Sequence, residues 1–279
     1  MREKCGLFAA FSTSKTDVIP LVTIGLRGLQ HRGQEAWGIA TPTMNPFKQN
    51  GLVSENLDQS AQVLQQMKTN IAIGHVRYST AGGTSLSNAQ PLSINKKFCL
   101  AHNGTVCDLN SVNIKLTNQK PRRINDTSIV GKRLLSILKA NKFDWFKSIE
   151  LLCDELVGAY CFVILTPNNE IYAFRDTRGF RPLCIGWHKK SKTYLVSSES
   201  CAFSMIGAEL KRDIKPGEIV KISNQGVESY SFSRGERTAH CSFEYIYFAH
   251  PSSVIDQTSV YESRRKLGQM LAELYTVKG

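Results

Sequence analysis

Hydrophobic residues along this chain fall into short unbroken runs and into longer stretches with helical spacing. A short apolar run bounded by glycine, proline or polar residues is typical of a buried strand, whereas apolar residues three and four positions apart are typical of a helix. In the first part of the chain, such runs predict strands at residues 5–11, 37–40, 71–76 and 98–102. Helical spacing predicts helices at residues 17–29, 58–69, 127–140, 144–156 and 258–276.

Strands dominate the pattern after residue 157. Residues 158–166 and 170–175 predict a hairpin joined by Pro167-Asn168-Asn169, and further strands are expected near 182–187, 193–198 and 218–223. Strands and helices occur in separate blocks without regular βαβ alternation, which favours mixed α and β layers with largely antiparallel sheets. Residues 224–240 are polar and rich in turn formers, so this segment is the best candidate for a domain boundary.

Composition is that of an ordinary globular protein. The 279 residues are 42% hydrophobic and 21% charged, enough for one large domain or two small ones. No apolar run approaches the roughly 20 residues that a membrane-spanning helix needs, and the first residues are too polar for a secretory signal. We therefore expect a cytoplasmic protein without membrane association.

Charge and cysteine usage exclude little further. The net charge of +12 comes from basic residues scattered in short groups, which favours a solvated basic surface over nucleic-acid binding. The eight cysteines never form a C-x-x-C pair and lie mostly in apolar stretches, as buried reduced thiols do. The six histidines show no ligand spacing, so we expect no metal site. Three of them, His31, His75 and His102, are expected to order loops or to pack.

Four short segments place polar groups at the end of an apolar strand, where a rigid scaffold can present them to a ligand. They are Cys5-Gly6, His31-Arg32-Gly33-Gln34, the segment 75–80, and Ala101-His102-Asn103-Gly104. Taken singly, each has an ordinary structural explanation: a buried thiol, a turn or a surface charge. Their significance lies in their combination and order.

In this order the segments resemble the glutaminase domain of the class II, or N-terminal nucleophile, glutamine amidotransferases, and amidophosphoribosyltransferases in particular. The matching segments are CGLFAAF, LQHRGQEAWGIA, GHVRYSTAGG, NAQPL, AHNGTV, RDTRGFRPLCIG, SSESCAF, PGEIV and CSFEYIYFAHPSSVIDQTSVYESRRKLG. They span residues 5 to 268, and the last one is typical of amidophosphoribosyltransferases. The resemblance implies an α+β fold, a four-layer αββα sandwich of two mainly antiparallel sheets. It also implies an enzyme that hydrolyses glutamine.

The resemblance assigns the nucleophile to Cys5. In this family the cysteine is the first residue of the mature chain, and its own α-amino group accepts the thiol proton. A free α-amine has a pKa of about 7.7–8.0, so it is partly neutral at physiological pH. This implies that residues 1–4 are a removable leader, because the Cys5 nitrogen is an amide while Lys4 remains attached.

Other site residues follow from the same resemblance. The side-chain amide of Asn103 and the backbone N–H of Gly104 match the donors that stabilise the oxyanion of the tetrahedral intermediate. Arg32 and Gly33 match a loop that lies against the active cysteine and has a supporting role.

Three further residues match the part of the site that binds the amino-acid end of glutamine. Arg77 corresponds to the arginine that binds the α-carboxylate, and Thr80 to a neighbouring contact. Asp126 corresponds to the carboxylate that pairs with the α-ammonium group. Ser128 departs from the family pattern, since relatives commonly carry glutamate there.

The second domain of an amidophosphoribosyltransferase, which binds phosphoribosyl pyrophosphate, has no counterpart in the sequence. The only adjacent acidic pair, Asp154-Glu155, lies in a predicted helix, and no Walker-type loop is present. We therefore expect a glutaminase domain at 5–235, followed at 236–279 by a connecting segment and the start of an absent phosphoribosyltransferase domain. Mg²⁺ is expected only with a phosphoribosyltransferase domain. Cys241 matches an iron–sulfur ligand of some relatives, but we expect no cluster and no other cofactor in this chain.

Three explanations for such a chain remain open: a separately encoded glutaminase subunit, a fragment, or a paralogue without the acceptor half. In the first case a phosphoribosyltransferase chain, or self-association, would cover apolar residues of 241–279, including Tyr245 and Phe248. The expected function is glutamine hydrolysis that supplies ammonia to phosphoribosyl pyrophosphate in the first step of purine synthesis. The alternatives are a glutaminase that serves another acceptor and a non-catalytic regulatory protein.

Overall fold

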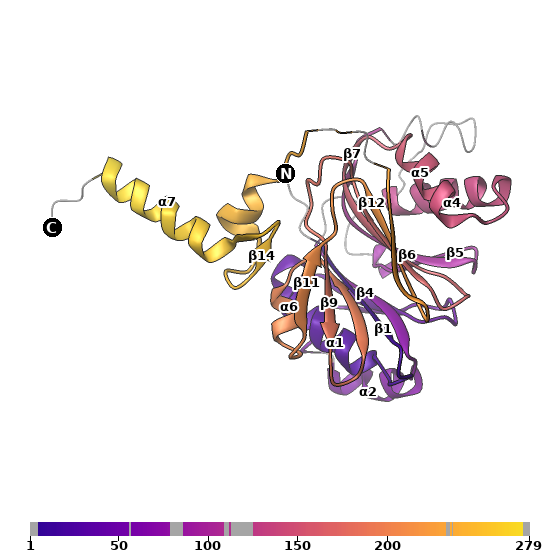
Figure 1. Cartoon of the computed structure of the whole chain (residues 1–279). Helices are drawn as coiled ribbons and strands as arrows, with labels where there is room; N and C mark the ends of the chain where they lie inside the picture. Colours follow the sequence, from indigo (N-terminus) through magenta and orange to yellow (C-terminus); the bar gives the residue numbers. More distant parts are fainter. Residues whose placement is uncertain are drawn as a thin grey trace.

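Two antiparallel sheets form the centre of the molecule, and helices cover their outer faces (Figure 1). The computed structural model describes residues 5–55, 57–78, 86–108, 112, 125–232, 235 and 237–275. Within these residues the first sheet has seven strands and the second has six. The first sheet runs, from edge to edge, β11 (Glu209–Asp213), β9 (Cys184–His188), β10 (Thr193–Ser197), β1 (Gly6–Ser12), β4 (Ile71–Arg77), β2 (Ala36–Ala40) and β3 (Phe47–Asn50).

The second sheet is built from the middle and late parts of the chain. Its order is β13 (Gly226–Ser231), β12 (Glu218–Ser223), β8 (Ile171–Arg175), β7 (Gly158–Leu165), β6 (Phe98–Val106) and β5 (Leu92–Ile94). Every strand pairing in both sheets is antiparallel among the residues that the structure describes. The expected preference for antiparallel sheets is therefore confirmed.

Helices lie on both outer faces. The first sheet carries α1 (Ile19–Gly28), α2 (Leu57–Gln66) and the short α6 (Cys201–Ser204), and the second carries α4 (Asp126–Ala140) and α5 (Trp145–Cys153). Polar residues cap the starts of α4 and α5. The side chain of Asn125 accepts a hydrogen bond from Thr127 N, and that of Asp144 accepts one from Lys147 N. Short 3₁₀ turns are η1 (Gln30–Arg32) and η2 (Leu86–Asn88).

Three hydrophobic cores separate the four layers. One lies between the two sheets, one between the first sheet and α1, and one between the second sheet and α4 with α5. Strand β1 shows why: Leu7 and Phe11 face the core between the sheets, whereas Phe8 faces the core under α1. Because both faces are covered, β1 is a continuous apolar run. The α+β four-layer sandwich expected from the resemblance is confirmed.

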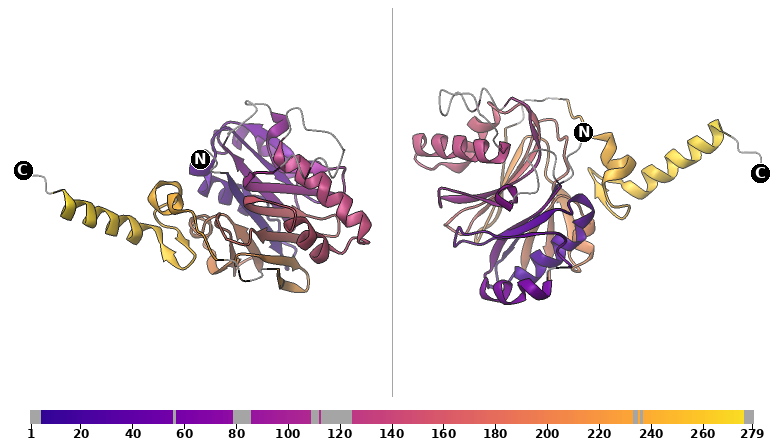
Figure 2. Two further views of the ribbon diagram at one scale, coloured as in Figure 1. Left: turned by 90° about the horizontal axis from the view of Figure 1, so that it is seen from above. Right: turned by 180° about the vertical axis from the view of Figure 1, so that it is seen from behind.

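The last part of the chain leaves the sandwich. A π-helical turn η3 (Glu244–Phe248) leads through the small hairpin β14 (Val254–Ile255) and β15 (Thr258–Ser259) to α7 (Val260–Leu274), which projects away from the sheets (Figures 1 and 2). Before that, Ala239 N donates to Arg178 O at 2.8 Å and Cys241 N to Phe180 O at 3.3 Å. The segment is thus attached to the sandwich before α7 departs from it. A boundary at residue 235 stays a prediction.

Some strands differ from the prediction. The segment 224–240, expected to be a turn-rich boundary, contains β13, which pairs with β12 along its whole length. Its side chains are almost all exposed because β13 is a sheet edge, so its sequence carries no apolar signal. The strand expected to end before Asn103 continues to Val106. No helix among the described residues is long and apolar enough to span a bilayer.

Candidate active site

The start of β1 lies beside the end of β4, because the two strands are antiparallel neighbours in which Gly6 pairs with Val76. This register places Cys5 next to the residues that follow β4. The Cys5 Sγ atom lies 3.8 Å from the carbonyl oxygen of Tyr78. Arg77, the last residue of β4, is largely buried. The sheet thus brings Cys5 beside Tyr78, which is 73 positions away in the sequence.

The 3₁₀ turn η1 packs against the same corner. Arg32 is buried, and its Nε donates a hydrogen bond to the backbone carbonyl of Cys5 at 3.0 Å. Gly33, the next residue, packs closely against the backbone of β4: a Cβ atom there would lie 2.6 Å from the carbonyl carbon of Arg77. Any side chain at this position would therefore push the loop away from β4. The loop therefore lies against Cys5.

Asn103 lies on β6, in the other sheet, and its side chain is completely buried. Neither its amide nitrogen nor its amide oxygen has a hydrogen-bond partner among the described residues. The two sheets are joined one residue earlier, where His75 Nε2 lies 3.1 Å from the carbonyl oxygen of His102. Burial lowers the pKa of His75 to about 3, so its ring is neutral at pH 7 and donates to that carbonyl.

Gly104 has a backbone conformation that favours glycine, with φ at +137°. A Cβ atom built there would lie 1.9 Å from the carbonyl oxygen of Ala159 on the neighbouring strand. A side chain would therefore displace β7 as well as strain the backbone. The requirement for glycine at position 104 therefore comes from strand packing.

Asp126 begins α4 and lies close to β6. Its Oδ2 is 3.5 Å from His102 Nδ1, and its Oδ1 accepts a hydrogen bond from Thr127 N at 2.7 Å. Burial alone would raise the pKa of Asp126, but His102 and the hydrogen bonds from Thr127 outweigh it and lower the pKa. The carboxylate is therefore ionised at neutral pH. Gln90 supports this corner by donating to Thr127 Oγ1 and accepting from His102 N.

The remaining predicted contact residue, Thr80, lies outside the described residues. The histidines act as expected, since His75 and His102 order the strand junction and the His102 ring also stacks on Phe162 at 4.3 Å. Cys241 lies 4.0 Å from Arg181 Nη1. The expected lack of a cluster there stays a prediction.

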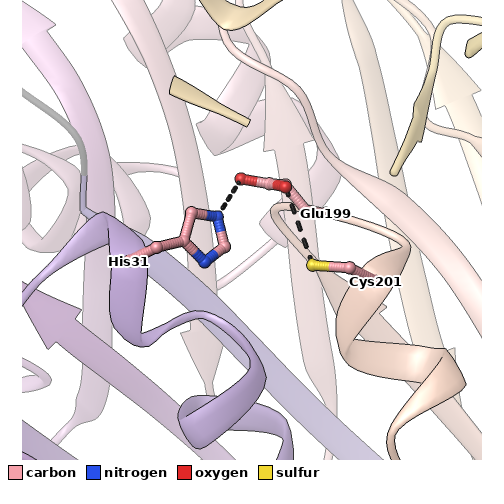
Figure 3. A group of neighbouring side chains, drawn as sticks. All are labelled: His31, Glu199 and Cys201. Carbon is pink, nitrogen blue, oxygen red and sulfur yellow. Dashed lines mark hydrogen bonds and ion pairs between the residues drawn. The ribbon is translucent and has the colours of Figure 1, made fainter. Parts of the chain in front are cut away.

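Figure 3 shows a second cluster behind the η1 turn, in which His31 and Cys201 flank the carboxylate of Glu199. These three residue types can hold a metal ion, but both oxygens of Glu199 are already engaged. One oxygen pairs with His31 at 2.9 Å and with the buried guanidinium of Arg32, and the other accepts from Ser253 Oγ at 2.7 Å. Burial raises the pKa of Cys201 to about 12, which keeps its thiol protonated. A cation here would face Arg32, so we interpret the cluster as a hydrogen-bond junction.

Sequence reasoning gave no role to Glu199 or to its counterpart Glu244, although both lie in segments that carry the resemblance. Glu244 is buried and forms two 2.8 Å hydrogen bonds with Arg32. The only signal in the sequence for these two residues was that each is an acidic residue inside an apolar or small-residue segment. Their shared partner, Arg32, is far from both of them in the sequence.

Comparison with known proteins agrees with this geometry. A family described as a glutamine amidotransferase domain matches residues 75–205. The amidophosphoribosyltransferase of Synechococcus elongatus is 36% identical over 283 residues, covering 97% of this chain and 56% of that protein. That of Bacillus subtilis is 37% identical, covering 98% of this chain and 57% of that protein. The mouse enzyme is 36% identical, with 98% and 59% covered. The chain thus spans somewhat more than half the length of these relatives.

Solved structures give the same result. Glutamine phosphoribosylpyrophosphate amidotransferase from Bacillus subtilis, complexed with ADP and GMP, superposes with a TM-score of 0.86 at 35% identity, covering 98% of this chain and 59% of that one. A protein from Silicibacter pomeroyi described as a glutamine aminotransferase class-II domain protein has a TM-score of 0.56 at 13% identity. The match covers 82% of this chain and all of that one, and it supports the fold alone. The fold is that of the N-terminal nucleophile hydrolases. The chain belongs to the glutamine amidotransferase family and is a domain of the kind found in amidophosphoribosyltransferases.

Proposed function

We propose that this chain hydrolyses glutamine at Cys5 to glutamate and ammonia. The observation that carries the proposal is the Asn103 carboxamide, which is completely buried and has no hydrogen-bond partner among the described residues. An unpaired buried polar group costs about 1–3 kcal/mol, so an unsatisfied amide on a strand of the core calls for a functional explanation. A donor held ready for an oxyanion supplies one.

The proposed chemistry uses the two ends of Cys5. After removal of residues 1–4, the free α-amine accepts the thiol proton, and the thiolate attacks the carboxamide carbon of glutamine. The oxyanion forms near the Asn103 amide and the Gly104 N–H. Collapse of the tetrahedral intermediate breaks the C–N bond, and the α-ammonium group returns its proton to the leaving nitrogen. Water then hydrolyses the thioester to glutamate and the free thiol. These steps require no metal or cofactor.

Binding of the amino-acid end of glutamine follows from charge. We assign the α-carboxylate to the guanidinium of Arg77 and the α-ammonium group to Asp126, whose lowered pKa keeps it negative. Thr80 is proposed as a neighbouring contact on the strength of the motif. Arg77 ends β4, the strand whose end approaches Cys5, whereas Asp126 lies beside His102, the residue before Asn103. The opposite charges of Arg77 and Asp126 would hold the amino-acid end of glutamine between the ends of the two sheets.

We further propose that the ammonia goes to phosphoribosyl pyrophosphate, in the first step of cytoplasmic purine synthesis. This rests on the names of the relatives, of which the chain spans somewhat more than half. A phosphoribosyltransferase chain would bind the C-terminal face, which we define as the exposed apolar side chains of η3 and α7. They are Ile246, Tyr247, Tyr261, Leu267, Met270, Leu271 and Leu274. Contrary to the sequence-based expectation, Phe248 is buried, and Tyr245 packs on a small hydrophobic core within the C-terminal segment. Neither side chain therefore needs a partner protein to cover it.

The test is an assay with glutamine labelled with ¹⁵N in its amide, run with and without phosphoribosyl pyrophosphate and a phosphoribosyltransferase chain. We expect glutamate from this chain alone, and ¹⁵N-phosphoribosylamine only when both are added. Absence of glutamate under all conditions would refute glutamine hydrolysis. Glutamate without labelled phosphoribosylamine, in the complete mixture, would refute the acceptor and leave the glutaminase serving another one.

A further inference from the structure

Two buried carboxylates converge on the guanidinium of Arg32, which contacts the nucleophile residue Cys5. Glu244 binds Arg32 with both oxygens, at 2.8 Å to Nη1 and 2.8 Å to Nη2, and Glu199 binds Nη1 from the other side. The remaining Arg32 donor, Nε, points to the Cys5 carbonyl at 3.0 Å. The three charged side chains are 0–1% exposed. Every nitrogen of this guanidinium is thus engaged.

The two carboxylates come from separate parts of the chain. Glu199 follows β10 and accepts further hydrogen bonds from His250 N at 2.8 Å and Ser253 Oγ at 2.7 Å. Glu244 opens η3 and also pairs with Arg181 at 3.4 Å. Residues 244–253 of the C-terminal segment are therefore connected to the carbonyl of Cys5 through Arg32.

Opposite charges meet in this buried group, which includes Arg181 as well as Arg32. Two arginines face two glutamates. Burial alone would raise the pKa of the Glu199 carboxyl, but Arg32 and His31 outweigh burial and lower that pKa. Burial would lower the pKa of Arg32, but Glu244 and Glu199 together raise it. Loss of one carboxylate would leave a buried cation undercompensated, and such a cation moves toward water or another acceptor. Arg32 would then leave the Cys5 carbonyl.

The Cys5 carbonyl matters because a first residue is held by the chain on one side only. Rotation about its Cα–C bond swings the amine and the thiol together, relative to the Asn103 amide. A hydrogen bond to the carbonyl oxygen fixes the peptide plane against which that rotation is defined. Chemical steps of this kind are sensitive to placement, and an error of about 1 Å can cost on the order of 10²-fold in rate.

We propose that Glu199 and Glu244 are positioning residues for glutamine hydrolysis, which hold Arg32 on the Cys5 carbonyl and thereby orient the amine and thiol of Cys5. This inference rests on the proposed glutaminase function. It makes residues 244–253, which lie outside the predicted glutaminase domain, part of the structure that supports the nucleophile.

The test compares Glu244→Gln and Glu199→Gln with Asp256→Asn. The control breaks a similar pair in the same C-terminal segment: Asp256 binds Arg175 with both oxygens at 2.8 Å, and not Arg32. We expect Glu244→Gln and Glu199→Gln each to lower kcat by about tenfold to a hundredfold, with KM for the substrate glutamine changed less than threefold. The pH midpoint for alkylation of Cys5 by iodoacetamide should shift as well. Asp256→Asn should retain kcat within threefold and the wild-type midpoint.

Ser253→Ala provides a milder variant, because it removes one hydrogen bond to Glu199 without changing any charge. It should lower kcat by about threefold and leave KM unchanged. If Glu244→Gln or Glu199→Gln fails to fold, Ser253→Ala decides whether the two glutamates position Cys5. The inference fails if Glu244→Gln and Glu199→Gln fold and match Asp256→Asn in kcat and in the alkylation midpoint. It also fails if neither of these two variants folds and Ser253→Ala keeps the wild-type kcat. If the unmodified chain does not hydrolyse glutamine at all, the proposed function itself is wrong.

Discussion

Cys5→Ala is expected to abolish glutamine hydrolysis, with kcat reduced by about 10⁴-fold or more, as is usual when the nucleophile of a covalent mechanism is removed. In the proposed mechanism the thiol sulfur of Cys5 forms the acyl intermediate, and alanine offers no nucleophile in its place. Cys5 lies half-exposed before the first strand, so alanine should leave the fold intact. Release of glutamate by the purified variant, alongside its thermal unfolding, measures both effects.

Cys107→Ala is the matched control for this prediction. Cys107 is the exposed free cysteine that follows β6, and it has no place in the proposed chemistry. Its alanine variant should hydrolyse glutamine at the wild-type rate and should still be labelled at Cys5 by a glutamine-analogue electrophile. A Cys5→Ala protein that retained a tenth of normal turnover would exclude Cys5 as the nucleophile.

Asn103→Ala is expected to lower kcat by about 10²–10³-fold, the usual effect of removing one oxyanion donor. KM for glutamine should change little, because the charged contacts are assigned to Arg77 and Asp126. Stability should be nearly unaffected, since the Asn103 amide makes no hydrogen bond with the described residues that its loss could break. Steady-state kinetics and thermal unfolding of the same preparation test the two expectations together.

Asn141→Ala should give the opposite pattern. Asn141 caps the far end of α4, where its Nδ2 donates to Ile137 O at 2.9 Å. Its loss should lower stability by about 0.5–1.5 kcal/mol and leave kcat unchanged. If Asn103→Ala lost stability and kept its activity, the unpaired amide would be a structural feature and the oxyanion assignment would be wrong.

The sequence predicted the strands that lie inside the two sheets, and it missed those at their edges. Central strands such as β1 and β4 are buried on both faces, so they appear as continuous apolar runs. Within the two large sheets, the four strands without a prediction are β3, β5, β11 and β13, and among the described residues they are the outer strands. An edge strand buries few side chains and keeps polar residues toward water, so its sequence resembles that of a loop.

The site shows a similar division. Cys5, Arg77 and Asn103 could be proposed from the sequence because each lies in a short motif beside or within an apolar strand. The Glu199 and Glu244 contacts were not, because they join Arg32 across 167 and 212 residues. Periodicity reports which residues are buried along one element, but it carries no information on which distant charges meet in the fold. The reason for Gly104 was also hidden, since it depends on a carbonyl of the neighbouring strand.

The central claim is that Cys5 acts with its own free amine, and intact-mass spectrometry before and after reaction with a glutamine-analogue electrophile tests it directly. We expect active preparations to have lost residues 1–4 and to gain one adduct at Cys5, with the labelled fraction equal to the fraction of activity lost. Fully active protein that still carries Met1 to Lys4 would contradict the claim, because its Cys5 nitrogen would be an amide and could not accept a proton.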